Sequence, residues 1–165
     1  MKEYKYIGKS VTRIDALEKI SGAAIYGDDI DFGPNLLYAE LVSSTEAHAI
    51  IKGIDTSAAE QVPGVYKVFT GKDFPCKFGL YMKDRYVFAQ DKVRFVGEQI
   101  AAVVARSPQA AKQGAALVKV DYEPLPAVLD QMEALKDDAV ILHPELGEYP
   151  HVPWFYPKAG TNIAH

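Results

Sequence analysis

The chain has 165 residues, a length typical of one domain with or without a short extension. Hydrophobic residues make up 48% of it and charged residues 24%, as in an ordinary globular protein. Its net charge of −4, with no cluster of Lys and Arg, argues against a protein that binds nucleic acid through the phosphate backbone.

The single cysteine, Cys76, excludes an internal disulfide and fits a reducing compartment. The N-terminal residues lack the apolar core of a secretory signal. The longest apolar run, at 100–105, is much shorter than the roughly 20 residues of a membrane span. We therefore expect a cytoplasmic protein that does not enter a membrane.

The first half of the chain predicts a loop followed by strands. Residues 8–31 read as a loop with one short element at 15–20, followed by a turn at Ser21-Gly22. Apolar, β-branched and aromatic runs then predict strands at residues 36–44, 47–55 and 65–70. The first of these is apolar on both alternating faces, which predicts a strand covered on both sides. Thr56 or Ser57 is expected to cap a short helix before the third strand.

The middle of the chain holds the most apolar strand pattern. Residues 71–85 contain glycine, proline and scattered charge and predict a long loop. Brief strands are expected at 86–89 and within 91–97. Residues 99–105, QIAAVVA, are too apolar for a surface strand and should lie at the centre of the sheet.

A helix and a last strand follow. Ser107 suits the N-cap and Pro108 the first helical position. The helix is expected to pack through a narrow face of small residues, namely Ala111, Ala115 and Ala116. Residues 118–123 alternate apolar and polar side chains, which predicts a strand, and Asp130 is expected to cap a short helix after it.

The residues from 147 onward differ from the rest in composition. They hold four aromatics and three prolines within 147–157 and show no helical or strand period. We expect a domain at 1–146 and an extended tail at 147–165 that lies on another surface. The element order predicts an α+β fold, a mixed β-sheet with two or three helices packed on it.

No pattern in the sequence predicts a self-contained reaction centre. There is no glycine-rich phosphate loop, and His48, His143, His151 and His165 lack the spacing of a metal site. The carboxylates at positions 28, 29 and 31 read as a solvated turn, and Cys76 as a bystander. Glu98 could point into a cleft, but we favour a strand-start residue that faces water. His48, between two alanines, is best explained as a buried hydrogen-bonding residue.

Four blocks of residues nevertheless resemble a known family. The first, R-x-D-A-x-x-K-x-x-G-x-A-x-Y-x-x-D, is matched by Arg13, Asp15, Ala16, Lys19, Gly22, Ala24, Tyr26 and Asp29. The others are S-x-x-A-H-A-x-I-x-x-I-D at 44–55, V-x-x-V-G-x-x-[IV]-A-x-V-V-A at 93–105 and V-x-Y-E-x-L-P-A-V at 120–128. Together they resemble the large subunit of xanthine dehydrogenases and aldehyde oxidases, the molybdenum hydroxylases.

The resemblance implies a fold, a reaction and a division of labour. The matching segment of that family is the N-terminal α/β hammerhead domain. Its enzymes hydroxylate purines, N-heterocycles or aldehydes with oxygen from water at a molybdenum–molybdopterin centre, while iron–sulfur clusters and FAD carry the electrons away. The pterin-binding segments and the general base lie beyond this domain. We therefore expect a fragment of a larger subunit that binds no cofactor, contains no catalytic residue and is inactive alone.

One site assignment follows from the same resemblance. In the family a G-L-[FY] motif shortly before V-F-A contributes apolar side chains to the mouth of the substrate channel. Here Leu80 and Tyr81 occupy those positions, which implies a role at the channel rim of the complete enzyme.

The expected partners are the molybdopterin-binding domains of the same subunit and the FAD and iron–sulfur domains or subunits. Self-association into a homo-oligomer is a further option. The alternative function is a stand-alone binding or assembly module with the hammerhead fold and no redox activity.

Overall fold

The computed structural model describes residues 4–164, which divide into two compact units, one that ends at Leu36 and one that begins at Leu37. Of the described residues, none belongs to a helix long and apolar enough to cross a membrane.

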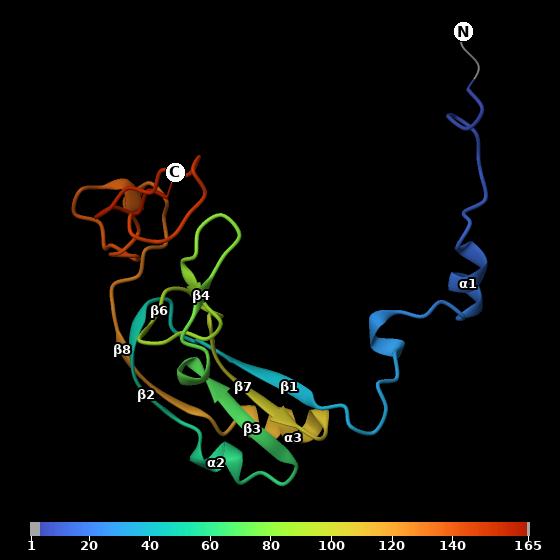
Figure 1. Ribbon diagram of the computed structural model, residues 1–165, viewed down its shortest axis with the longest axis horizontal. Coiled ribbons are helices and arrows are strands. Elements are labelled where there is room, and N and C mark those ends of the chain that lie inside the picture. Colours follow the sequence, from blue (N-terminus) through green and yellow to red (C-terminus); the bar gives the residue numbers. More distant parts are fainter. Residues whose placement is uncertain (1–3, 165) are drawn as a thin grey trace. The chain divides into compact units, whose positions relative to one another are not determined.

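The first unit contains two short helical elements in an otherwise irregular chain (Figure 1). Helix α1 spans Ala16–Ser21 and ends at Gly22, whose φ of 74° is the left-handed conformation that glycine tolerates best. The 3-10 helix η1 spans Gly27–Asp29. The predicted short element and the turn after it are thus confirmed. Neither helix contains a buried residue.

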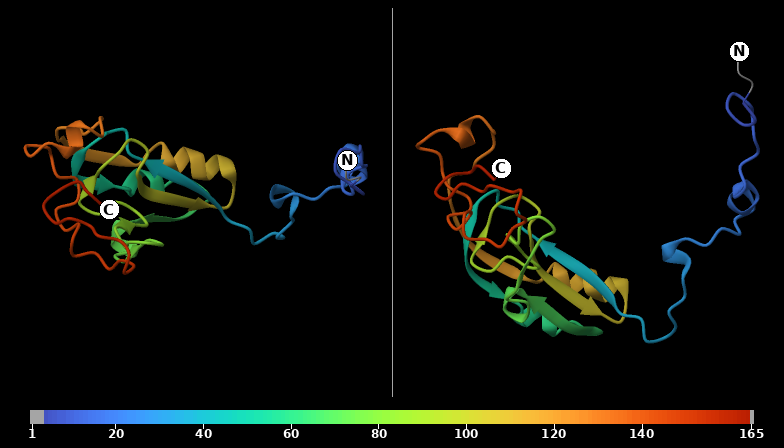
Figure 2. Two further views of the ribbon diagram at one scale, coloured as in Figure 1. Left: turned by 90° about the horizontal axis from the view of Figure 1, so that it is seen from above. Right: turned by 45° about the horizontal axis from the view of Figure 1, so that its top comes forward.

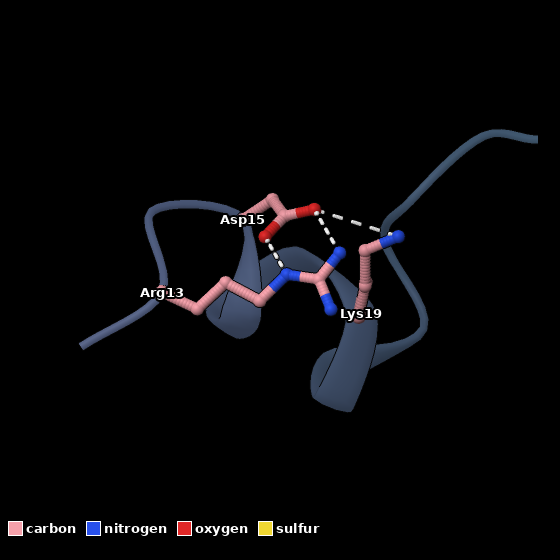
Figure 3. A network of polar contacts seen from close by, with 3 residues as sticks. All are labelled: Arg13, Asp15 and Lys19. Carbon is pink, nitrogen blue, oxygen red and sulfur yellow. Dashed lines mark hydrogen bonds and ion pairs between the residues drawn. The ribbon is translucent and has the colours of Figure 1, made fainter. Parts of the chain in front are cut away.

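Charged residues of the first sequence block pair with one another at the start of α1 (Figure 3). The guanidinium of Arg13 donates to both carboxylate oxygens of Asp15, at 2.5 and 3.0 Å, and the Lys19 ammonium lies 3.5 Å from the same carboxylate. The amide of Tyr26 donates to Asp29 at 2.9 Å. The charged positions of the block are therefore explained by pairing within the block.

A three-stranded antiparallel sheet forms one half of the second unit. Its order is β1 (Tyr38–Ser43), β7 (Gln99–Ala105) and β3 (Val65–Thr70). The predicted central position of 99–105 is confirmed, and most of β7 is buried. The prediction that β1 is covered on both sides is wrong. It is an edge strand of its sheet, and five of its six residues are exposed.

Helix α3 (Pro108–Ala115) packs against this sheet (Figure 2). The Ser107 hydroxyl accepts the amide of Ala110 at 3.2 Å, which confirms the predicted cap. The predicted packing face is confirmed for Ala111, which is buried, and for Ala115, which packs against the core, but Ala116 is exposed. The other buried residues of the helix are Ala110 and Gly114. Gly114 lies so close to the sheet that an added Cβ would be 2.8 Å from Val103 Cγ1.

A second antiparallel sheet has the order β6 (Lys92–Val93), β2 (Ala49–Asp55) and β8 (Lys119–Pro124). Ala49, Val93 and Ile100 are fully buried in the core beneath it. Helix α2 (Ser57–Glu60) follows β2, but the predicted cap is wrong. The Thr56 side chain makes no capping bond, and the Asp55 carboxylate accepts the amide of Ser57 instead.

The loop predicted at 71–85 contains two small elements, the 3-10 helix η2 (Gly71–Asp73) and a hairpin. The hairpin pairs β4 (Lys77–Phe78) with β5 (Arg85–Tyr86). The strands expected at 86–89 and within 91–97 are reduced to β5 and β6, two residues each.

The chain after β8 contains the 3-10 helix η3 (Glu133–Leu135) as its regular element among the described residues. Asp130 caps it as predicted, accepting the amides of Met132 and Glu133 at 2.8 and 3.0 Å. Further on, Leu146 and Tyr149 are buried against Met82 of the hairpin loop. The α+β class is confirmed, with the strands distributed over three small sheets and with α2 and α3 packed beside them.

Candidate functional site

His48 lies directly before β2 and is only 4% exposed. Its Nδ1 is 2.7 Å from the carbonyl oxygen of Pro126, so the ring nitrogen must be the donor. Its own carbonyl accepts the amide of Leu125 at 2.8 Å. The expected buried, hydrogen-bonding role of His48 is therefore confirmed.

The second sequence block binds the third block through Ser44 and the fourth block through His48. Ser44, which opens the second block, is 3% exposed and donates its backbone amide to the carbonyl of Glu98 at 2.8 Å. The amide of Gly97, in the third block, donates to the carbonyl of Ser44 at 2.8 Å. Leu125 and Pro126, which bind His48, belong to the fourth block. These motif residues join segments of the fold and present no reactive group to solvent.

Glu98 differs from its expected place. It is partly buried, and its carboxylate accepts the backbone amide of Arg94 at 2.6 Å. Burial raises the pKa of this carboxyl above its ordinary value, while the bond from Arg94 acts in the opposite direction. The residue closes the short turn 94–98 instead of facing water.

Within residues 4–164 no three His, Cys, Asp or Glu side chains come close enough together to hold a metal ion. Cys76 is exposed. The Asp31 carboxylate accepts the amide of Gly33 at 2.7 Å, and Asp29 accepts that of Tyr26, so these two carboxylates stabilise turns.

A polar cluster in the C-terminal part was not predicted from the sequence. The buried Tyr149 donates its hydroxyl to Glu145 at 2.7 Å, and the same hydroxyl lies 3.3 Å from His143 Nδ1. Burial, together with the nearby positive charge of Arg94, lowers the pKa of His143 from 6.5 to about 4. Burial and the bond to Glu145 raise the pKa of Tyr149.

This cluster is anchored to the second sheet. The side chains of Lys92 and Arg94 donate to the carbonyl of Leu142 at 3.0 and 3.2 Å, just before His143. The Lys77 ammonium lies 4.3 Å from the centre of the Tyr149 ring. The i, i+4 spacing of Glu145 and Tyr149 was visible in the sequence, but their approach to β4 and β6 was not.

Leu80 and Tyr81, the predicted rim residues, lie in the loop of the β4–β5 hairpin. They are 83% and 55% exposed. They border a hollow of about 840 Å³ whose other lining residues include Phe78, Arg85 and Phe155. The sequence therefore located a loop with exposed apolar side chains, and the structure adds Phe155 from the tail.

The a/b hammerhead domain model of aldehyde oxidase and xanthine dehydrogenase matches residues 21–126. The chain belongs to this family. Among its relatives, the nicotinate dehydrogenase large molybdopterin subunit of Eubacterium barkeri is 35% identical over 144 residues, and the xanthine dehydrogenase/oxidase of Rattus norvegicus is 41% identical over 139.

Solved structures agree with this assignment. The hammerhead chain superimposes on the aldehyde oxidoreductase of Desulfovibrio gigas with a TM-score of 0.73 and 36% identity, covering 80% of this chain and 16% of that protein. The sequence matches cover 86% and 83% of this chain, but only 34% of the Eubacterium protein and 10% of the rat protein. The hammerhead domain is thus a small part of these relatives.

Proposed function

We propose that this hammerhead domain frames the mouth of the substrate channel in a molybdenum hydroxylase and has no reaction of its own. The observation that carries the proposal is the hollow of about 840 Å³ bordered by the exposed side chains of Leu80 and Tyr81. Small-molecule sites are typically concave and lined mostly by apolar and aromatic side chains. The complete protein would hydroxylate purines, N-heterocycles or aldehydes with water as the oxygen source.

The cofactors of that reaction would be held by other domains or subunits. An iron–sulfur cluster is normally held by several cysteines, and this chain has one. Within residues 4–164 the acidic and histidine side chains also form no metal-binding group. We therefore assign molybdenum–molybdopterin, the iron–sulfur clusters and FAD to the remaining domains of the subunit and to its FAD and iron–sulfur partners.

Docking onto those domains is supported by the first unit. Large apolar side chains are exposed along it, namely Ile7, Val11, Ile14, Leu17, Ile20 and Ile25. Exposed apolar surface of this extent is typical of a contact with another protein surface. In the same way we propose that residues 147–165 lead toward a molybdopterin-binding domain. A cytoplasmic location is supported by the exposed, unpaired Cys76.

The channel-mouth role can be tested in a chimera. This chain would replace the matching segment of the Eubacterium barkeri subunit, and the kinetics of nicotinate oxidation would be measured. We expect Leu80→Ala and Tyr81→Ala to raise KM for substrate by about three- to tenfold, since one apolar side chain contributes about 1 kcal/mol of binding. Because neither residue touches the reacting atoms in this account, kcat should stay within about twofold.

Matched controls are available on the same unit. Leu129 is 87% exposed and Tyr66 is 65% exposed, and neither borders the hollow. Leu129→Ala and Tyr66→Ala should leave both constants unchanged. If the rim and control substitutions changed KM equally, the channel-mouth role would be refuted. A purified chain that oxidised substrates by itself would instead refute the division of labour.

A further inference from the structure

The loop that carries the rim residues is weakly held by its own hairpin. Strands β4 and β5 are two residues long, and the loop between them covers residues 79–84. An isolated hairpin, even one with longer strands, is marginally stable in water. The position of Leu80 and Tyr81 must therefore depend on contacts from outside the hairpin.

Those contacts come from the C-terminal tail. The amide of Lys83 donates to the carbonyl of Pro150 at 2.9 Å, and the amide of Val152 donates to the carbonyl of Tyr81 at 2.9 Å. Together they form an antiparallel bridge between Met82 and His151. In Figures 1 and 2 the tail lies beside the hairpin loop.

Side chains reinforce the bridge on the same side as the hollow. The rings of Tyr81 and Phe155 are nearly parallel, at 9°, with centroids 6.4 Å apart. Phe155 also packs against the buried cluster of Met82, Leu146 and Tyr149. The tail therefore fixes the backbone of the rim loop and the ring of one rim residue.

We propose that residues 150–155 clamp the rim loop and that Phe155 is a positioning residue for Tyr81. The tail thereby sets the width of the hollow that Leu80 and Tyr81 border. The clamp consists of contacts within this chain. Its effect on substrate rests on the channel-mouth role proposed above.

The clamp is tested by residue-resolved amide hydrogen exchange on the full chain. Phe155→Leu removes the stacked ring but keeps an apolar side chain in the cluster, and Phe155→Ala removes both. We expect the amides of Lys83 and Val152 to exchange about three- to tenfold faster in Phe155→Leu, from the usual strength of an aromatic pair. The effect should be larger in Phe155→Ala and absent in Phe155→Tyr.

Two comparisons separate a local clamp from general destabilisation. Phe95→Ala is the matched control, because Phe95 is 51% exposed and lies outside the tail and the hairpin. It should leave Lys83 and Val152 unchanged, and the amides of β7 should be unchanged in all variants. Unaltered exchange at Lys83 and Val152 in both Phe155→Leu and Phe155→Ala would overturn the clamp. An increase in the exchange rate of the β7 amides equal to that at Lys83 and Val152 would also overturn it.

The consequence for substrate is measured separately in the chimera. Phe155→Leu should raise KM about threefold or more with kcat nearly unchanged, the same direction as Tyr81→Ala. Faster amide exchange without a change in KM would uphold the clamp and contradict the channel-mouth role. A lower kcat at unchanged KM would contradict a positioning role for Phe155.

Discussion

His48 shows how one residue can join two distant segments. Its ring binds the carbonyl of Pro126 and its backbone binds the amide of Leu125, so β2 and the end of β8 are fixed at one point. A histidine beside serine and glutamate in a sequence invites a catalytic interpretation. Its burial and these two bonds give it a structural role, while its buried Nε2 has no hydrogen-bond partner among the described residues.

Replacing His48 tests this explanation. In His48→Ala the Pro126 carbonyl loses its donor and a cavity replaces the ring, so the free energy of unfolding should fall by about 2–3 kcal/mol. Urea denaturation followed by circular dichroism measures the change. Thr45→Ala, at an exposed position of the same segment, is the control and should cost less than about 0.5 kcal/mol. A stable His48→Ala protein would contradict the structural role.

His143 gives a prediction for pH. Its pKa in the folded chain is about 4, below the ordinary 6.5, mainly because the ring is buried. Between these values the unfolded chain binds more protons than the folded chain, so stability falls as the pH is lowered from 6.5 to 4. His143→Gln should lessen that fall, as measured by urea denaturation across this range. A ring that titrates near pH 6.5 in a nuclear magnetic resonance titration of the folded protein would contradict the prediction.

At the scale of elements, local pattern predicted some features and missed others for a physical reason. The apolar run of β7 and the Ser107-Pro108 start of α3 are local signals, and both elements were predicted. The exposure of β1 depends on which elements cover it, and the run of apolar residues at 36–44 carries no such information. The same holds for the rim loop, whose conformation is set by a tail about 70 residues away.

The contact between α3 and the first sheet predicts the effect of filling it. Alanine in place of glycine usually stabilises a helix by about 0.5–1 kcal/mol. At Gly114 the new Cβ would lie 2.8 Å from Val103 and 3.1 Å from Val65, so Gly114→Ala should instead destabilise the protein by about 1–3 kcal/mol. The midpoint of urea denaturation measures this.

The neighbouring Gln113 is exposed on the same helix, so Gln113→Ala should be neutral or slightly stabilising. If Val103 causes the clash, the double variant Gly114→Ala/Val103→Ala should lose less stability than the two single variants together. A stabilised Gly114→Ala protein would show that the helix can move away from the sheet.

At the scale of the whole molecule, the family could be recognised from four separate blocks of sequence. The structural roles of the residues in those blocks could not. Ser44 binds Gly97 and His48 binds Pro126, so residues of one block pair with residues of two distant blocks through hydrogen bonds of the fold. Such contacts cannot be read from spacing, because they depend on the pairing of β2 with β8 and on the turn before β7. The candidate site was therefore predictable as a loop, Leu80 and Tyr81, but not in its dependence on Phe155.

We propose that this hammerhead domain works only together with cofactor-bearing domains. Molybdenum content and substrate oxidation with an acceptor dye, measured for the chain alone and for the Eubacterium barkeri chimera, test this proposal. We predict that the chain alone contains no molybdenum and oxidises nothing, while the chimera contains molybdenum and turns over nicotinate. Molybdenum-dependent oxidation by the isolated chain, or a properly folded chimera that takes up no molybdenum, would contradict the account.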